Sequence, residues 1–278
     1  MRILLKIGGS GLEQTEARSA FCRSVAAARR AGHEIAIVHG GGNQIREMCR
    51  RLSIEQRYHD GLRVTDEQTA EVVLMVLSGL VNGTLVADLE RAGVPAVGIS
   101  GADGGTFSAR RLNKAGIDLG FVGAIEKTDP SLCDLLLSSG RVPVIATVAP
   151  GPEAGGPFLN VNADHAAGPL CRALGCDAVL FLSDVEGVVG AEGQRIEHLA
   201  PEECSLLAKS GVIRGGMLPK IEAALLALSE CPEAIVKIGK SGEDCVLRLL
   251  DPGEGTEFAD QNRGERPRER EGASWTKD

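Results

Sequence analysis

The feature that most constrains the fold is the alternation of short apolar runs with longer segments of helical period. Apolar runs of strand length occupy residues 3–7, 34–38, 96–99, 142–147, 178–182 and 235–238. Segments with helical spacing lie between them, at residues 16–31, 43–52, 66–80, 85–92, 131–138, 163–174, 201–209 and 218–228. Strands that are apolar throughout are buried on both faces of a parallel sheet. The sequence therefore predicts an α/β fold, a three-layer α/β/α sandwich around a central, mainly parallel sheet.

Two regions and the C-terminal end depart from this alternation. Residues 106–126 contain short alternating segments around glycines, and residues 149–159 are rich in Pro and Gly, so both are predicted to form hairpins. Residues 258–278 are mostly polar and charged, and they are predicted to form a disordered tail. A chain of 278 residues is long enough to bury a core as one large domain or as two lobes.

The net charge of -8 argues against a nucleic-acid partner, because sequence-independent binding needs a basic face. It leaves room for small anionic ligands, which a local ring of Lys, Arg and backbone N–H groups can hold. The N-terminal apolar run ends at once in a glycine pair, so we expect no signal peptide. No run approaches the roughly 18 apolar residues of a membrane span, which predicts no membrane partner and a cytoplasmic protein.

The eight cysteines form no C-x-x-C pair, and most lie in apolar helical stretches. We therefore expect buried, reduced thiols. The five histidines are scattered, so the sequence predicts no protein-held metal site.

Glycine clusters directly follow several predicted strands, at the sheet edge where parallel α/β folds bind ligands. In the first, Lys6 precedes Gly8 and Gly9, whose backbone N–H groups can converge on phosphate oxygens. In the second, three glycines at 40–42 join a strand to a helix N-terminus, which favours a carboxylate or phosphate. The first cluster matches neither the Walker-type nor the dinucleotide-binding glycine pattern.

Later segments add charged and polar candidates. Arg63, just before a predicted helix, is placed to hold a carboxylate bidentately, and a surface salt bridge is the alternative. At 160–164, Asn-Val-Asn-Ala-Asp opens another helix, with Asn162 as a candidate cap. Residues 182–188 suggest a strand end that turns into a nucleotide-lining loop. Pro219 in the first turn of a helix directs Lys220 toward that helix's start.

Taken in this order, these segments resemble the amino acid kinase family, and within it the acetylglutamate kinase branch, from Lys6 to about Thr256. The most specific segments are residues 38–42, 61–65, 160–164, 183–185 and 216–220. The resemblance implies a lobe of residues 1–170 that binds the amino acid and dimerises. A second lobe, residues 171–257, would bind ATP.

The resemblance also implies residue roles. Lys6 and Lys220 would stabilise charge on the transferred phosphoryl group, with Asp164 orienting both lysines. The acetylated amino acid would be bound by Gly41, Gly42, Arg63 and Asn160. The adenine nucleotide would be contacted by Gly8, Gly9, Asp184, Val185, Glu186, Gly187, Val188, Val189, Val212, Ile213 and Arg214. Family members use ATP with Mg²⁺, held mainly by the nucleotide, and convert a side-chain carboxylate into an acyl phosphate.

The chemistry of the residues agrees with these roles. Phosphoryl transfer needs positioning and neutralisation of charge on the equatorial oxygens. A carboxylate acceptor is already ionised at pH 7, so no general base is required. The resemblance therefore implies ATP-dependent phosphorylation of the side-chain carboxylate of N-acetyl-L-glutamate, a step of arginine biosynthesis.

Other functions stay open at this stage. Within the same fold the acceptor can be an aminoadipate derivative, free or carrier-linked, as in lysine biosynthesis, or aspartate, carbamate or UMP. Glutamate and aminoadipate acceptors differ by one methylene, which changes substrate discrimination by only ~1–3 kcal/mol. The sequence therefore does not decide between them. A catalytically silent amino-acid sensor is the alternative from another class. Because the sequence begins close to its first strand, without the extra helix of arginine-inhibited hexamers, we expect a homodimer without that feedback control.

Overall fold

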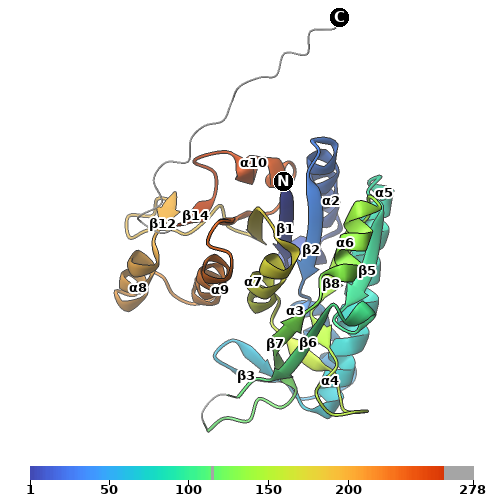
Figure 1. The fold of residues 1–278 in the computed structure, drawn as a ribbon. Helices are drawn as coiled ribbons and strands as arrows, with labels where there is room; N and C mark the ends of the chain where they lie inside the picture. The colour runs from blue at the N-terminus through green and yellow to red at the C-terminus, as the bar shows by residue number, and fades with distance from the viewer. Residues whose placement is uncertain (114–115, 260–278) are drawn as a thin grey trace, which may run out of the picture.

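Figure 1 shows the fold in a computed structural model, which describes residues 1–113 and 116–259. Most of the predicted tail, residues 260–278, lies outside the described residues. The last strand ends at Phe258, whose side chain is fully buried, so the packed fold extends to this residue.

The central sheet has eight strands in the order β12-β14-β13-β11-β1-β2-β8-β5. The strands are β1 (Arg2–Ile7), β2 (Glu34–His39), β5 (Ala96–Ser100), β8 (Val142–Ala146), β11 (Ala178–Ser183), β12 (His198–Leu199), β13 (Ile235–Lys240) and β14 (Thr256–Phe258). All neighbouring strands in this sheet are parallel except β13 and β14. The six predicted strands are confirmed, and the short strands β12 and β14 extend one edge.

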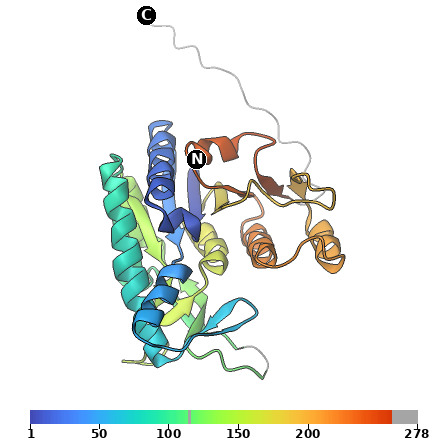
Figure 2. The ribbon, with the colours of Figure 1, turned by 180° about the vertical axis from the view of Figure 1, so that it is seen from behind.

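Helices cover both faces of this sheet (Figures 1 and 2). One face carries α1 (Ser10–Glu13), α2 (Thr15–Arg30), α3 (Gly42–Arg51), α4 (Glu67–Leu74), α5 (Asn82–Arg91) and α10 (Cys245–Leu250). The other carries α6 (Ser131–Ser138), α7 (Ala163–Leu174), α8 (Pro201–Lys209) and α9 (Met217–Glu230). Along β1, Ile3 and Leu5 face the first layer and Leu4 the second, because successive strand residues point to opposite faces. The three-layer prediction is confirmed.

Two helices predicted at 66–80 and 85–92 are one continuous helix in the structure. It runs over Glu67–Arg91, and its middle, η1 (Met75–Val81), is a π-helix. Contrary to the expectation from sequence, this helix is long and apolar enough by composition to cross a membrane. However, 44% of its most apolar window is buried inside the fold, and Val76, Leu77 and Val81 pack in the core.

A smaller sheet lies beyond the C-terminal ends of β1 and β2 (Figure 1). Its order is β6-β7-β10-β9, with β6 (Phe107–Arg111), β7 (Val122–Thr128), β9 (Val148–Ala149) and β10 (Leu159–Val161). The antiparallel pairs β6–β7 and β9–β10 confirm both predicted hairpin regions. A short helical turn, η2 (Asp103–Gly105), precedes β6.

A further hairpin, β3 (Arg57–His59) and β4 (Leu62–Val64), was not predicted. Its two-residue turn places Asp60 and Gly61 at φ values of 46° and 77°, which suits Asp-Gly in a hairpin turn. This hairpin and the smaller sheet together cover the C-terminal edge of the central sheet, and we call them the roof.

The prediction of free thiols is confirmed. All eight cysteines are unpaired; seven are buried and Cys231 is half-buried. Burial raises the pKa of the Cys22 thiol to about 12, so it stays protonated.

Candidate active site

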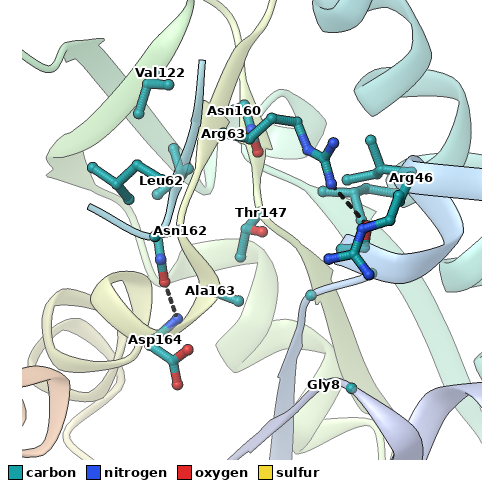
Figure 3. Close-up of a pocket in the computed structure, with 18 of the residues that line it drawn as sticks. Gly8, Arg46, Leu62, Arg63, Val122, Thr147, Asn160, Asn162, Ala163 and Asp164 are labelled. Atoms are coloured by element: carbon teal, nitrogen blue, oxygen red, sulfur yellow. Dashed lines mark hydrogen bonds between the residues drawn. The ribbon is translucent and has the colours of Figure 1, made fainter. Parts of the chain in front are cut away.

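A cavity of about 320 Å³ lies between the C-terminal edge of the central sheet and the roof formed by the smaller sheet and the β3–β4 hairpin (Figure 3). It brings together nine of the predicted site residues, which are Lys6, Gly8, Gly9, Gly41, Gly42, Arg63, Asn160, Asp164 and Lys220. Residues that are up to 214 positions apart in sequence, from Lys6 to Lys220, therefore line one space. The predicted nucleotide residues 184–189 and 212–214 do not line this cavity.

One end of the cavity holds an ion pair. The Lys6 ammonium, at the end of β1, lies 2.6 Å from Asp164 Oδ1, and the Lys6 side chain is only 7% exposed. Asp164 sits in the first turn of α7, whose cap is Asn162: its Oδ1 accepts from the Asp164 N–H at 2.8 Å. The cap prediction is confirmed. It fixes the turn that carries Asp164, and so fixes the position of Lys6.

Lys220 joins this pair from the first turn of α9. Its pKa is lowered, first by burial and then by the Lys6 charge, while Asp164 and Asp184 act in the opposite direction. Lys220 lines the same cavity as Lys6 and Asp164, and the Asp184 carboxylate is close enough to act on its charge. Two ammonium groups held in one partly buried site favour a multiply charged anion between them.

Close packing of α7 on α9 brings the two helices together. A Cβ at Gly168 would lie 3.2 Å from Ala227 Cα, so glycine favours this close approach. Further along, Arg172 Nη1 pairs with Glu230 Oε2 at 2.6 Å. Because both contacts run in the same order along the two helices, α7 and α9 are parallel. Their N-terminal ends, which carry the positive ends of the helix dipoles, therefore point in the same direction, toward the cavity that Asp164 and Lys220 line.

The triple-glycine loop forms the floor of the cavity between β2 and α3. A Cβ at Gly41 would lie 2.7 Å from Leu77 Cδ2 and 3.0 Å from Val81 Cγ2, both on the π-helical segment. The backbone therefore packs directly on η1 and leaves the N-terminal N–H groups of α3 open to the cavity.

His39, just before this loop, is fully buried and hydrogen-bonded at both ring nitrogens. Its Nδ1 lies 2.9 Å from the Gly40 carbonyl oxygen, and its Nε2 lies 2.9 Å from Asn82 Nδ2. Asn82 Nδ2 also donates to the Val144 carbonyl at 2.8 Å, so the contacts assign an Nδ1–H tautomer. Burial lowers the pKa of His39 to about 4. His39 is therefore a neutral structural residue that holds the glycine loop.

Arg63 occupies the other end of the cavity and is 7% exposed. Its guanidinium donates to the Gly42 carbonyl at 2.8 Å and to Gln56 Oε1, and it lies 4.8 Å from the centroid of the Tyr58 ring. Burial, more than any other cause, lowers its pKa. Within residues 1–113 and 116–259, Arg63 forms no ion pair with a carboxylate. The alternative of an ordinary surface salt bridge is wrong for this arginine.

The rest of the acceptor end combines polar and apolar groups. Asn160, on β10, donates from Nδ2 to Thr65 Oγ1 at 3.2 Å, which orients its amide. The apolar lining includes Leu62, Leu77, Val122 and Val161. The cavity is thus cationic at both ends, with an apolar middle that suits the methylenes and acyl group of a small acid.

Two polar or aromatic lining residues that the sequence did not suggest are Arg46 and Tyr58. Arg46 lies one turn after Gly42 on a helix that starts at the glycine loop. That i to i+4 spacing is the signal that places its side chain over the same site. Tyr58 belongs to the unpredicted β3–β4 hairpin, and the Asp60-Gly61 turn was the signal that could have indicated it.

The predicted nucleotide residues lie on loops next to Lys220. The Asp184 carboxylate accepts from Ser183 Oγ at 2.9 Å, and this hydrogen bond lowers its pKa. Asp184, Glu186, Val189 and Arg214 are exposed, and Val185 and Val212 are half-buried. Gly187, Val188 and Ile213 are buried; the latter two pack in the core, so only their backbone is available to a ligand.

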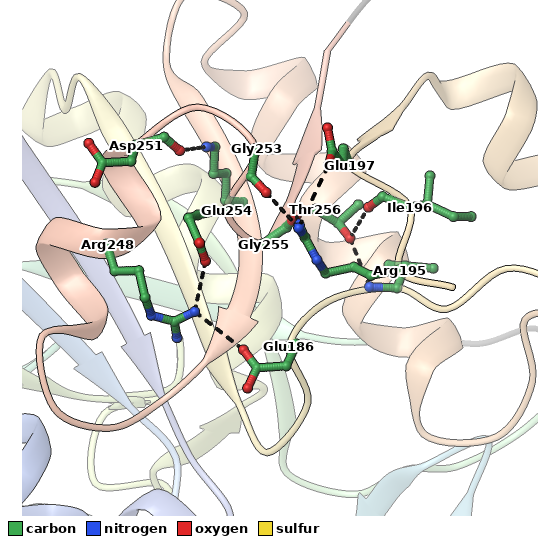
Figure 4. Close-up of polar contacts among 12 residues, drawn as sticks. Glu186, Arg195, Ile196, Glu197, Arg248, Asp251, Gly253, Glu254, Gly255 and Thr256 are labelled. Atoms are coloured by element: carbon green, nitrogen blue, oxygen red, sulfur yellow. Dashed lines mark hydrogen bonds and ion pairs between the residues drawn. The ribbon is translucent and has the colours of Figure 1, made fainter. Parts of the chain in front are cut away.

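Ion pairs attach the loop of residues 184–189 to the C-terminal part of the fold (Figure 4). Glu186 pairs with Lys240 Nζ at 3.2 Å and with Arg248 Nη1 at 3.3 Å, and Arg248 also pairs with Glu254 at 2.9 Å. Next to it, Thr256 Oγ1 accepts from the Val188 N–H at 2.8 Å. We call Glu186, Lys240, Arg248 and Glu254 the loop latch.

The donor set of the site suits a phosphate chain. Lys6, Lys220 and the N–H groups near Gly8 and Gly42 all favour anionic oxygens, and Asp164 is already engaged by Lys6. Among the described residues, no group of three or more His, Cys, Asp or Glu side chains is arranged to hold a metal. The residues thus fit a metal ion that arrives on the phosphate oxygens.

An α/β fold whose cavity combines two lysines, glycine turns and a buried arginine defines a class of protein, the α/β kinases that act on small molecules. The model of the amino acid kinase family matches residues 1–237. The chain belongs to the amino acid kinase family.

Relatives and solved structures agree with this assignment. The chain is 40% identical over 259 residues to the acetylglutamate kinase of Brucella anthropi, covering 89% of this chain and 87% of the relative. The acetylglutamate kinase of Gluconobacter oxydans is 41% identical over the same coverage. The crystal structure of smu.665 from Streptococcus mutans has a TM-score of 0.79 and 27% identity, covering 93% of this chain and 98% of that chain. N-acetylglutamate synthase from Neisseria gonorrhoeae shares the fold at a TM-score of 0.80 and 22% identity, covering 94% of this chain and 59% of the synthase.

Proposed function

We propose that this chain transfers the γ-phosphoryl group of ATP to the side-chain carboxylate of N-acetyl-L-glutamate. This is the reaction that the family resemblance of the sequence implies. The observation that carries the proposal is one cavity that joins the Lys6–Asp164–Lys220 group to an unpaired buried arginine, Arg63. The acetylglutamate kinases at about 40% identity support the same substrate.

In this proposal the acceptor spans the cavity. Arg63 and Asn160 bind the carboxylate and acylated nitrogen side of the acceptor, and the N–H groups of Gly41 and Gly42 hold the reacting carboxylate. That carboxylate is the nucleophile, and it is ionised at neutral pH, so no side chain has to remove a proton. The rate enhancement comes from alignment and from charge neutralisation.

Lys6 and Lys220 neutralise the negative charge that develops on the oxygens of the phosphoryl group in flight. Asp164 keeps the two ammonium groups at a fixed separation and offsets their repulsion. Gly8 and Gly9 leave room for the phosphate chain at the end of β1. Because the groups are fixed before the reaction, little reorganisation is needed during transfer.

We also propose that ATP binds along the loops of residues 184–189 and 212–214, next to Lys220. Mg²⁺ would be carried on the nucleotide's phosphates, where it neutralises charge and orients the β- and γ-phosphate oxygens. The coulombic link between Asp184 and Lys220 supports a nucleotide whose terminal phosphate reaches the lysine pair.

The proposal extends to the organisation of the molecule. Residues 1–170 form the acceptor-binding and dimerising lobe, and residues 171–257 form the ATP-binding lobe. A homodimer is supported by Met75 and Leu80, large apolar side chains that are 57% and 52% exposed on the long helix. Free, buried thiols support a reducing, cytoplasmic location. Light scattering after size-exclusion chromatography that gives a monomer or a hexamer would contradict the dimer.

The test of function is an ATP-dependent hydroxylamine trap for acyl phosphate, with N-acetylglutamate and N-acetylaminoadipate compared side by side. We expect hydroxamate from N-acetylglutamate at the higher kcat/KM. A preference for N-acetylaminoadipate would replace the named substrate and keep the mechanism. Tight binding of either acid without any hydroxamate would instead indicate an amino-acid sensor.

A further inference from the structure

We propose that Arg46 is a second acceptor-binding arginine, which together with Arg63 binds the carboxylate of the acceptor that does not react. This makes Arg46 a specificity-determining residue of the acceptor site. The inference rests on the proposed kinase function.

The two guanidinium groups share one end of the cavity. Both Arg46 and Arg63 line it, and Figure 3 shows their side chains reaching into the same space from α3 and β4. Their charges interact, because Arg46 contributes to lowering the pKa of Arg63. Arg46 is exposed and Arg63 is buried, so Arg46 stands at the mouth and Arg63 inside.

Within residues 1–113 and 116–259, no carboxylate forms an ion pair with either arginine. Among the described residues, the Arg46 guanidinium forms no hydrogen bond or ion pair, although Glu47 is its neighbour in sequence. Glu47 instead pairs with Arg50 and Arg51, both at 2.8 Å. The helix thus directs its nearest carboxylate away from the cavity and leaves Arg46 facing a second cation.

Arg63 also has N–H donors that are left available to a ligand. Its contacts to the Gly42 carbonyl and Gln56 Oε1 use two of the five N–H groups of a guanidinium. Two like charges at one end of a partly closed cavity repel each other until an anion lies between them.

A carboxylate fits this place better than a phosphate. The planar fork of a guanidinium matches the two oxygens of a carboxylate, and two arginines can engage both of them. The lysine pair, Lys6 and Lys220, already provides the phosphate end on the other side of the glycine loop. In N-acetylglutamate the reacting carboxylate is directed to the lysines, so the α-carboxylate is the one left for the arginines.

The test compares two acceptors in the hydroxylamine assay: N-acetylglutamate and its α-amide, in which a neutral carboxamide replaces the α-carboxylate. With N-acetylglutamate, Arg46→Ala should raise the KM ~10-fold or more, as expected for loss of a charge-assisted hydrogen bond. The kcat and the KM for ATP should stay close to those of the wild type. With the α-amide, the same substitution should change the KM less than about 3-fold, because no charge is left to bind.

Arg46→Lys keeps the charge but not the fork, and its KM should lie between those of the wild type and Arg46→Ala. Arg50→Ala, one turn further on α3 and outside the cavity, is the matched control and should leave both acceptors unaffected. An equal KM increase with both acceptors, or none with N-acetylglutamate, would overturn the inference.

Failure of the proposed function gives a different result. In that case the wild-type chain would form no hydroxamate from N-acetylglutamate. The comparison is then made by calorimetric binding of N-acetylglutamate, N-acetylaminoadipate and their α-amides. Loss of the wild-type preference for the free acids in Arg46→Ala supports the role of Arg46, and an unchanged preference contradicts it.

Discussion

The cavity and the loops predicted to bind the nucleotide differ in how far their side chains are buried. At the cavity, Lys6 and Arg63 are 6% and 7% exposed, and His39, next to the glycine loop, is 0% exposed. On the side of the predicted nucleotide loops, the latch side chains Glu186 and Lys240 are more than half exposed.

The two regions are therefore stabilised differently. Buried hydrogen bonds and the buried ion pair at the cavity are costly to leave unpaired and are weakly screened. The exposed loop latch contributes little to stability and is weakened by salt. The cavity should therefore respond strongly to single substitutions, and the predicted nucleotide loops mildly.

The largest effect is expected at the lysine pair. Lys220→Ala or Lys6→Ala should each lower kcat by ~10²–10³-fold, because each removes a cation that stabilises the transferred phosphoryl group. Nucleotide binding, measured by calorimetry, should change much less. Lys127→Ala, an exposed lysine on β7 outside the cavity, is the control. Turnover near that of the wild type in either variant would refute the two-lysine mechanism.

Asp164→Asn should change the pH dependence of the reaction. Asp164 raises the pKa of Lys220, against the lowering by burial and by Lys6. Without this carboxylate the Lys220 pKa falls further, so the ammonium loses its proton at a lower pH. The alkaline limb of the kcat profile, measured with both substrates saturating, should consequently move to lower pH. A limb at the wild-type position would show that Asp164 does not act on the lysines.

Substitutions of the buried amide of Asn82 and of the exposed carboxylate of Glu186 compare the stability contributions of the cavity and of the loop latch directly. Asn82→Ala leaves the Val144 carbonyl and His39 Nε2 without their donor, which should lower the free energy of unfolding by about 1–3 kcal/mol. Glu186→Gln removes two exposed ion pairs and should cost less than about 1 kcal/mol.

Urea denaturation measures both values, and Asn113→Ala, at an exposed position, is the control for amide loss. Glu186→Gln should also raise the KM for ATP by a few-fold at low salt, with a smaller increase at high salt. A larger loss of stability in Glu186→Gln than in Asn82→Ala would reverse the comparison.

Much of the fold was readable from local patterns. The six apolar strands and the hairpin regions follow from periodicity and from turn residues, which act over a few positions. The long helix was misread as two, because the predicted break at residues 81–84 contains Asn82, Gly83 and Thr84, which have low intrinsic helix propensity. Packing of Val76, Leu77 and Val81 in the core supports the continuous helix.

The site was readable only in part. Lys6, Arg63, Asp164 and Lys220 each had a local signal at a strand end or helix start, and the family resemblance joined them. Neither a local signal nor the family resemblance had assigned Arg46 or Tyr58 to the site. Their place in the cavity depends on how the β3–β4 hairpin and α3 approach each other, and that approach is set by contacts between distant segments.

The sequence by itself determined the layered α/β fold, the anion-binding glycine turns and the residue types needed for phosphoryl transfer, because each depends on local geometry and chemistry. Only the tertiary structure decided that Lys6 and Asp164 form an ion pair and that Lys220 lines the same cavity. It also decided that Arg46 lines the same end of the cavity as Arg63, with no ion pair to any other described residue. These relations depend on the close packing of α7 on α9 and on the roof over the sheet, and distances between distant residues are not encoded in any single segment.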